Sequence, residues 1–210
     1  MKKVTIIDYG VGNLFGLKRA LEFCGAEVVI SEDAETIERA ERIVLPGVGA
    51  FEAGMRGLAT RGLIEPVQRV AARGTPMLGI CLGAQILLGK GHEFGEHDGL
   101  GIIPGSVVQL EGVKTNEKIP HVGWNSVVAP ESVAWEKTIF DALPHGFNVY
   151  FTHSYVFVPA QKEHVFGLTT YGGETFVSSM RKGNVYGVQF HPERSSETGL
   201  HIIKNFVTIA

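Results

Sequence analysis

A cysteine bracketed by glycines is the feature that most restricts the fold of this chain. Cys81 lies in Gly79-Ile80-Cys81-Leu82-Gly83, directly after the apolar run Met77-Leu78. This order predicts a strand, a sharp turn and a helix, with the cysteine on the turn. Glycines fit there because the turn strains the backbone and side chains at the flanking positions would clash. The following helix N-terminus favours a thiolate. Cys81 is therefore a candidate nucleophile, with simple core packing of the thiol as the alternative.

The last third of the chain supplies a base for such a thiol. Val185-Tyr186-Gly187-Val188-Gln189-Phe190 has the composition of a buried strand and leads directly into His191-Pro192-Glu193. Pro192 stiffens this segment and biases His191 towards an extended backbone, so that Glu193 can share a face with His191. A carboxylate that orients an imidazole suits activation of a thiol nucleophile. A surface histidine beside a solvated glutamate is the alternative.

Strand-like and helical patterns alternate over the first ninety residues. Strands are expected at 4–8, 27–30, 42–45 and 77–80. Helices are expected from 14 until Gly25, at 34–40 and at 58–72, the last broken around Gly62 and Pro66. This order predicts an α/β fold with a mostly parallel central sheet flanked by helices. Ligands of such folds bind at the carboxyl ends of the strands.

The pattern changes after Gly101. Short β-rich runs at 106–110, 124–128, 148–152 and 155–158 predict an antiparallel, β-rich extension of the sheet. A helix is expected at 201–210. Because no linker, repeat or low-complexity tract divides the sequence, residues 1–210 are expected to form a single domain.

Composition excludes several classes of function. The 210 residues are 44% hydrophobic, enough for a substantial core. A net charge of −3 without a Lys/Arg cluster gives no support to nucleic-acid binding. No apolar run approaches the roughly 20 residues that span a bilayer. Two cysteines without a secretory signal indicate a cytoplasmic location. No cofactor is expected, and a loop at 89–101 lacks metal-site spacing in its acidic and imidazole side chains: His92, Glu93, Glu96, His97 and Asp98.

A second glycine-rich loop, Pro46-Gly47-Val48-Gly49, follows a strand that is predicted to run parallel to the Cys81 strand. Its glycines let backbone N–H groups approach a ligand closely. Acyl transfer through Cys81 needs two donors for a tetrahedral oxyanion. We expect one from the N–H of Leu82 and the other from this loop, with Val48 or Gly49 as its source. A plain glycine-rich turn is the alternative.

At this point the motifs resemble a known family. The chain is similar to class I glutamine amidotransferases and, more narrowly, to the glutaminase subunits of bacterial imidazole glycerol phosphate synthase. The resemblance covers the whole chain and is carried by five runs in order: Asp8-Tyr9-Gly10-Val11-Gly12-Asn13, Pro46-Gly47-Val48-Gly49-Ala50-Phe51, Gly79-Ile80-Cys81-Leu82-Gly83-Ala84-Gln85, Pro120-His121-Val122-Gly123-Trp124-Asn125 and Gln189-Phe190-His191-Pro192-Glu193.

The resemblance implies a Cys-His-Glu triad of Cys81, His191 and Glu193 that hydrolyses L-glutamine to glutamate and ammonia through a thioester. It also implies that the amino-acid end of glutamine is held by Gln85 and by the backbone of four residues: Gly49, Thr152, His153 and Ser154. Independently of the family, Gln85 lies four residues after Cys81 on the predicted helix, so its amide can face the same pocket. An exposed helix residue is the alternative for Gln85.

The resemblance further implies a partner, a separate (βα)₈-barrel cyclase subunit in a heterodimer. Ammonia would pass directly to it, because free ammonia is protonated in water at neutral pH. The joint products would be imidazole glycerol phosphate and an aminoimidazole carboxamide ribotide, in histidine biosynthesis. The docking surface is expected at the carboxyl ends of the strands, and its candidate residues are Tyr9, Asn13, Trp124, Tyr150 and Arg194. Core packing is the alternative for Trp124.

Three other interpretations stay open at this stage. A cysteine hydrolase or peptidase could use the same Cys-His pair on the same fold. A dinucleotide-binding oxidoreductase is suggested by Gly10-Val11-Gly12, but the third glycine, Gly16, misses the required spacing by one residue. A non-catalytic partner protein is disfavoured by the intact Cys81, His191 and Glu193.

Overall fold

The computed structural model describes residues 1–111, 117–131 and 133–208. Its parallel half follows the predicted alternation of strand and helix. Five strands lie side by side there in the order β2, β1, β3, β4, β13, and each neighbouring pair is parallel. Their bounds are β1 (Lys2–Ile7), β2 (Ala26–Ser31), β3 (Ile43–Leu45), β4 (Met77–Ile80) and β13 (Val185–Val188). The last strand of the chain therefore lies beside β4, the strand that leads to Cys81.

The sheet continues beyond β13 through largely antiparallel strands, as the β-rich pattern predicted. The order is β12, β10, β7, β5 and β6, with β11 on the other side of β12. Their bounds are β5 (Lys90–Gly91), β6 (His97–Asp98), β7 (Gly105–Gln109), β10 (Tyr155–Pro159), β11 (Val165–Tyr171) and β12 (Glu174–Lys182). Two of these, β5 and β6, are two-residue strands inside the stretch that was expected to be a plain loop.

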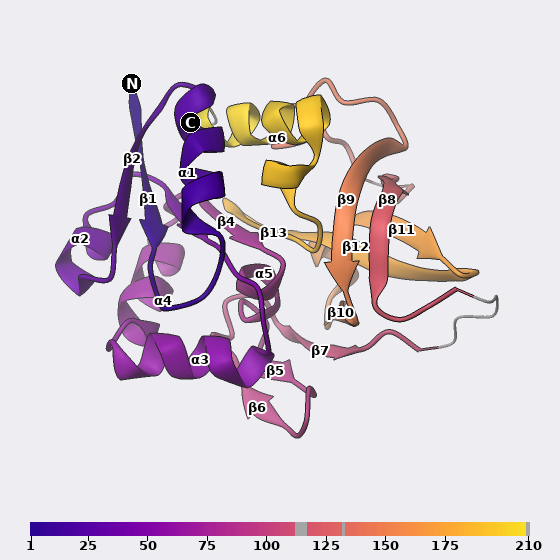
Figure 1. Cartoon of the computed structure of the whole chain (residues 1–210), viewed down its shortest axis with the longest axis horizontal. Helices are drawn as coiled ribbons and strands as arrows, with labels where there is room; N and C mark the ends of the chain where they lie inside the picture. Colours follow the sequence, from indigo (N-terminus) through magenta and orange to yellow (C-terminus); the bar gives the residue numbers. More distant parts are fainter. Residues whose placement is uncertain (112–116, 132, 209–210) are drawn as a thin grey trace.

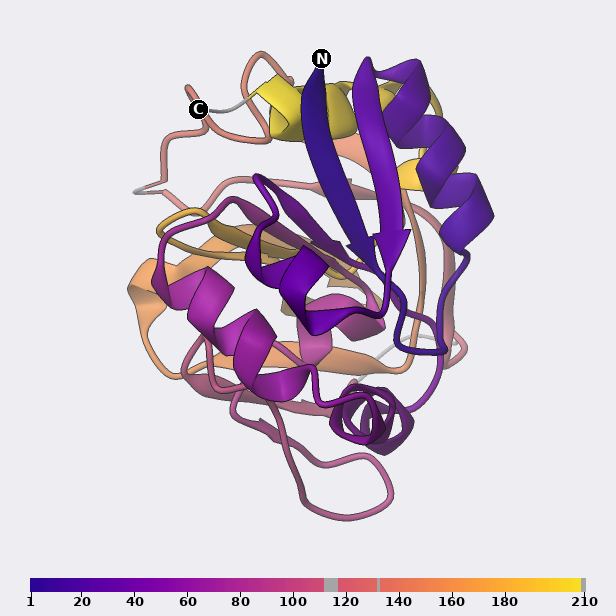
Figure 2. The ribbon, with the colours of Figure 1, turned by 90° about the vertical axis from the view of Figure 1, so that its left-hand side faces the viewer.

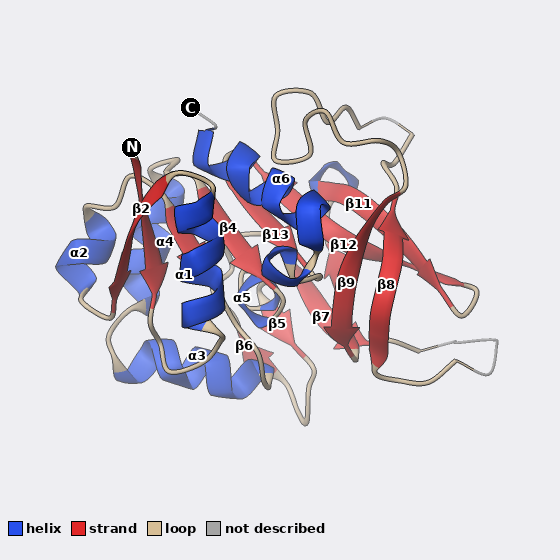
Figure 3. Ribbon diagram, turned by 45° about the horizontal axis from the view of Figure 1, so that its top comes forward, coloured by secondary structure: helices blue, strands red, loops and turns tan. Residues whose placement is uncertain are grey.

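The strands β8 (His121–Val127) and β9 (Phe147–His153) differ from expectation. They were predicted to extend the main sheet, but they pair with one another as a separate antiparallel ribbon. Figure 3 shows this ribbon standing beside β11 and β12. Its inner residues, such as Val149 and Phe151, are buried against the core, whereas Val122 and Trp124 on the outer face are exposed. One isolated bridge ties the ribbon to the edge of the sheet, because Val128, directly after β8, exchanges two backbone hydrogen bonds with Leu168 of β11.

Helices cover both faces of the parallel half (Figures 1 and 2). On one face, α1 (Leu14–Phe23) and α6 (Ser196–Thr208) share a buried apolar cluster with the inner side of the β8–β9 ribbon. On the other face lie α2 (Ala34–Glu38), α3 (Phe51–Thr60) and α4 (Ile64–Ala72), together with α5 (Leu82–Gln85). The sheet thus separates two cores, which is the layered arrangement that alternating strands and helices favour.

Two helix predictions need correction. The break predicted near Gly62 is confirmed, since a turn with φ of +67° there separates α3 from α4, but α3 begins at Phe51, seven residues before the expected start at 58. Pro66 lies in the first turn of α4, where its missing N–H costs nothing. The helix expected at 201–210 begins five residues earlier, at Ser196, and positions 209–210 lie outside the described residues. Among the helices of the described part, none is both long and apolar enough to cross a membrane.

Candidate active site

Cys81 sits on the predicted strand–turn–helix elbow. Its backbone is strained, with φ of +52° and ψ of −111°, and its N–H donates to the carbonyl of Val188 at 2.8 Å. The flanking glycines are required for packing. A Cβ on Gly79 would lie 2.8 Å from the Cα of Ala84, and one on Gly83 would overlap the carbonyl oxygen of Leu45. The helix that follows, α5, is a single turn, so the dipole it aims at the sulfur is smaller than a full helix would give.

His191 reaches the same place from the neighbouring strand. Val188 at the end of β13 lies opposite Ile80 at the end of β4, so the chain leaves both strands at one edge of the sheet. The backbone of His191 is fixed by the ribbon, since its N–H donates to the carbonyl of Tyr150 at 2.9 Å. Ser195 completes this anchor by accepting from the N–H of Tyr150 and donating to the carbonyl of His191, at 2.9 and 2.6 Å.

Glu193 orients the imidazole. It lies in the short 3₁₀ turn η2 (Pro192–Arg194), and its Oε1 is 2.9 Å from Nδ1 of His191. Both side chains are at least nine-tenths buried. Because Nδ1 faces the carboxylate, Nε2 is the nitrogen available to Cys81; it is buried and makes no hydrogen bond among the described residues. Burial by itself lowers the pKa of His191, but the interactions with Cys81 and Glu193 outweigh it and raise that pKa to about 10.

A cavity of about 590 Å³ opens at Cys81. Seven of the residues that the sequence assigned to nucleophile, oxyanion and substrate binding line it: Val48, Gly49, Cys81, Gln85, Thr152, His153 and Ser154. The other two, Gly47 and Leu82, are buried beside it. Gly47 has no room for a side chain, because a Cβ would lie 2.8 Å from the amide nitrogen of Gly83. The loop and the elbow are thus packed directly against each other.

One wall of the cavity is the corner where the chain passes from β9 into β10. His153 is buried there, and its Nδ1 is 2.9 Å from the carbonyl of Tyr155. A carbonyl only accepts, so Nδ1 bears the hydrogen, and Nε2 of His153 accepts from Nδ1 of His121 at 3.0 Å. Burial lowers the pKa of His153 to about 3 and that of His121 to about 4. These two imidazoles are neutral and hold the corner in place.

The residues expected at a partner interface fall into two groups. Asn13, Trp124, Tyr150 and Arg194 are exposed or half-buried, and Trp124 lies opposite Tyr150 in the ribbon with their rings 6.3 Å apart. Trp124 is 55% exposed, so it is not a core residue. Tyr9 is different. It is 1% exposed, and its hydroxyl donates to the carbonyl of Pro46. It supports the glycine-rich loop from beneath and presents no surface to a partner.

Two polar residues at the site were not assigned by sequence reasoning. Glu93 lines the cavity, and its carboxylate accepts from the N–H of Phe51 at the start of α3. Gln189 is fully buried, and its Nε2 is 3.6 Å from the sulfur of Cys81. The signal for Gln189 was present, because a glutamine stood inside an otherwise apolar strand run.

Two acidic residues of the loop around Glu93 form ion pairs with a lysine. Lys90 pairs with Glu96 and Asp98 at 2.8 and 3.0 Å. Among the described residues, no group of three or more His, Cys, Asp or Glu side chains is arranged to hold a metal ion.

The fold and this site define a class of enzymes. Residues 5–210 match the family described as glutamine amidotransferase class-I, and the chain belongs to that family. Two solved structures agree at the level of the fold. PurLQS from Thermotoga maritima gives a TM-score of 0.71 at 20% identity, covering 98% of this chain and 97% of that one. A glutamine amidotransferase from the same organism gives 0.65 at 17% identity, covering 94% and 78%.

Within that class the similarity to one subunit is far higher. The chain is 46% identical over 213 aligned positions to the imidazole glycerol phosphate synthase subunit HisH 1 of Legionella pneumophila (strain Lens), covering all of both chains. It is 45% identical over 206 positions to the HisH subunit of Moorella thermoacetica, covering 98% of this chain and 94% of that one. The chain is thus a glutamine amidotransferase of the HisH type, as the sequence motifs predicted.

Proposed function

We propose that this chain hydrolyses L-glutamine to glutamate and ammonia with Cys81, His191 and Glu193 as the catalytic residues. The observation that carries the proposal is the position of His191, which faces the buried sulfur of Cys81 through Nε2 and the carboxylate of Glu193 through Nδ1. The match to class-I glutamine amidotransferases supports glutamine as the substrate. Sheet strands from both ends of the described chain support treating residues 1–210 as one domain.

The proposed chemistry begins when His191, oriented by Glu193, takes the proton of Cys81. The thiolate of Cys81 attacks the γ-carbonyl of glutamine, a C–S bond forms, and the carbonyl oxygen becomes an oxyanion. The N–H of Leu82 and one from Val48 or Gly49 are the proposed donors to this oxyanion. His191 gives its proton to the departing nitrogen as the C–N bond breaks, and ammonia leaves. Water then attacks the thioester while His191 takes its proton, and cleavage of the C–S bond releases glutamate.

The glutamine would lie in the cavity of about 590 Å³ with its γ-amide over Cys81. Gln85 and the backbone at Gly49 and at the β9–β10 corner are the proposed holders of its amino-acid end. The polar lining supports this placement, since Thr152, His153 and Ser154 all face the cavity.

The ammonia is proposed to pass to a separate (βα)₈-barrel cyclase that makes imidazole glycerol phosphate and the aminoimidazole carboxamide ribotide in the cytoplasm. The names of the relatives, which are synthase subunits, support a second subunit. Trp124, Tyr150, Asn13 and Arg194 form the proposed contact surface. Charge-neutral ammonia is the nucleophile, so a dry transfer is chemically favourable.

The test measures ammonia release by this chain alone and with a purified barrel cyclase and its ribotide ligand. We propose that the glycine-rich loop turns its N–H towards the oxyanion only when the partner and its ligand are bound. One well-placed oxyanion donor is worth about 10²–10³ in rate, so the partner should stimulate ammonia release by about that factor. Cys81→Ser should abolish ammonia release, and Cys24→Ser, at the other cysteine, should leave it unchanged. Peptide cleavage without glutaminase activity would support the hydrolase alternative instead.

A further inference from the structure

Gln189 is a buried polar residue in direct contact with the sulfur of Cys81. Its side chain is fully buried at the centre of the site, and its Nε2 points at the sulfur of Cys81 from 3.6 Å. Its backbone is fixed as well, because its N–H donates to the carbonyl of Ser178 at 2.9 Å. The proposed reaction already uses His191 at this sulfur, and it gives Gln189 no part.

The orientation of the Gln189 amide is fixed by its neighbour. Gln85 is also buried, and its Nε2 lies 3.2 Å from Oε1 of Gln189 and 3.5 Å from the carbonyl of Tyr155. The carbonyl of Tyr155 can only accept, so the NH₂ end of Gln85 faces both oxygens. Gln189 must then present its oxygen to Gln85 and its NH₂ group to Cys81. The direction of the N–H bond towards sulfur therefore follows from the hydrogen-bond chain.

We propose that Gln189 is a further catalytic residue, which donates a hydrogen bond to the Cys81 thiolate, and that Gln85 is the positioning residue that aims it. This inference deepens the proposed glutaminase function, and it gives Gln85 a role besides holding substrate.

The hydrogen bond is selective among the states of the sulfur. A thiolate is a strong acceptor, whereas a thiol or a thioester sulfur is a weak one. Gln189 therefore stabilises the thiolate that attacks glutamine and, later, the thiolate that leaves when the thioester is hydrolysed. Nothing is transferred to or from Gln189, so the proton and electron balance of the reaction is unchanged.

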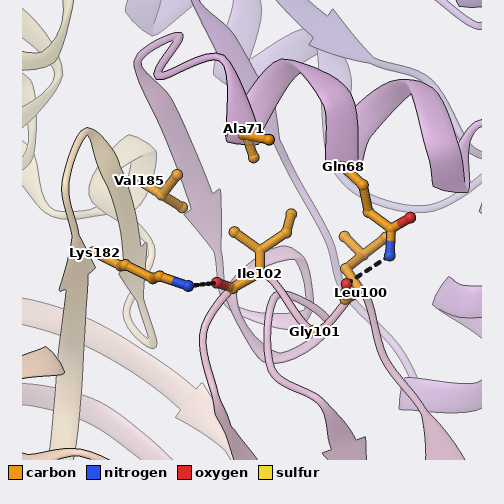
Figure 4. A pocket seen from close by; sticks show the side chains of 8 residues that line it. Gln68, Ala71, Leu100, Gly101, Ile102, Lys182 and Val185 are labelled. Atoms are coloured by element: carbon orange, nitrogen blue, oxygen red, sulfur yellow. Dashed lines mark hydrogen bonds between the residues drawn. The ribbon is translucent and has the colours of Figure 1, made fainter.

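A hollow of about 420 Å³ elsewhere on the molecule supplies a matched control. Figure 4 shows Gln68 and Lys182 on its wall, with Gln68 donating to the carbonyl of Leu100 at 2.8 Å and Lys182 to that of Ile102 at 2.8 Å. Both side chains therefore donate to main-chain carbonyls. Gln68 is thus a glutamine that bonds to main chain away from the sulfur.

The test follows the alkylation rate of Cys81 by iodoacetamide against pH, in the full chain without glutamine and in a Cys24→Ser background. The thiolate is the reacting form. Losing a hydrogen bond to a charged group changes an equilibrium about ten- to a hundredfold. Gln189→Met should therefore move the alkylation profile upward by about one to two pH units. Gln189→Glu keeps an acceptor for Gln85 but turns an anionic oxygen to the sulfur, and it should move the profile at least as far. Gln85→Met should move it less and in the same direction, and Gln68→Met should leave it in place.

Profiles of Gln189→Met and Gln189→Glu that superimpose on the parent would overturn the proposal. If neither variant folds, as judged by thermal unfolding, Gln85→Met decides the matter. An unchanged alkylation profile in Gln85→Met would mean that Gln85 does not orient a donor towards the sulfur, and it would overturn the proposal. An equal displacement in Gln68→Met would also contradict the proposal, because it would reveal a non-specific effect. The assay needs no turnover of glutamine, so its result stands apart from that of the proposed function.

Discussion

Val188 lies opposite Ile80 in the parallel pair of β13 and β4, and its carbonyl accepts the N–H of Cys81. This one register brings the proposed nucleophile, Cys81, and its proposed base, His191, to the same edge of the sheet, although they lie 110 positions apart in the sequence. The pairing of β13 with β4 therefore sets where Cys81 and His191 lie relative to each other. The predictions below test what that arrangement does.

The first prediction ranks the two residues behind Cys81. His191→Ala removes the base, whereas Glu193→Gln keeps an oxygen that can accept from Nδ1 of His191 and loses only the charge. The loss of glutaminase kcat should be roughly a hundredfold greater for His191→Ala. Steady-state kinetics of the complex measures it, with thermal unfolding as the check on folding. A greater loss in Glu193→Gln would mean that the two roles are wrongly assigned.

The second prediction concerns the glycine-rich loop. Gly49 has φ of +119° and open space around its missing Cβ, so Gly49→Ala strains only the backbone. Glutaminase activity should fall on the order of 10²-fold, as for a lost oxyanion donor. Gly62→Ala is the matched control, because Gly62 also has a positive φ and open space but lies between α3 and α4. Full activity in Gly49→Ala would take this loop out of the oxyanion site.

The third prediction concerns the exposed aromatic residue of the ribbon. Trp124→Ala should weaken the complex with the cyclase by about 2 kcal/mol, roughly thirtyfold in Kd, if Trp124 is an interface anchor. Ammonia should then exceed imidazole product, because it escapes to solvent. Phe23→Ala is the control, since Phe23 is 78% exposed at the far end of α1. Normal affinity and a one-to-one ratio in Trp124→Ala would exclude it from the interface.

The fourth prediction concerns acid stability. An unfolded chain protonates its histidines near pH 6.5, but burial keeps His121 and His153 neutral down to about pH 4 and 3. The unfolded state therefore binds more protons in this range, and the free energy of unfolding falls as the pH drops below 6.5. His153→Asn keeps a donor for the carbonyl of Tyr155 and removes one titrating group. The free energy of unfolding, measured with urea between pH 7 and pH 4, should fall less steeply with decreasing pH in this variant. An identical dependence on pH would contradict the assignment.

The sequence predicted best where a pattern was long and had one physical meaning. The strand that leads to Cys81 and the strand that leads to His191 were found from apolar runs that end in glycines or in His-Pro-Glu. The hairpin of β11 and β12 was missed, although Gly172-Gly173 between them has positive φ at both residues and suits a tight hairpin turn. The strands β5 and β6 are too short to show any period.

The site was predicted less completely than the fold. Cys81, His191 and Glu193 were assigned roles from the sequence, because their chemistry is visible in one residue type at one position. Gln189 and the pairing of His121 with His153 were not, since each depends on a contact between distant segments. The burial of Tyr9 was likewise hidden, because only the packing of the loop at Pro46 shows which way its ring turns.

The place of β13 between β4 and β12 also affects how the chain folds during its synthesis. A ribosome makes β1 to β4 first, yet the strand that fills the middle of the sheet, β13, follows only after β5 to β12 have been made. Until then β4 has an open edge, and apolar side chains such as Leu78 lack their final neighbours. The nascent chain is therefore exposed to misassembly until β13 has been made. His191 cannot lie beside Cys81 before that strand is in place.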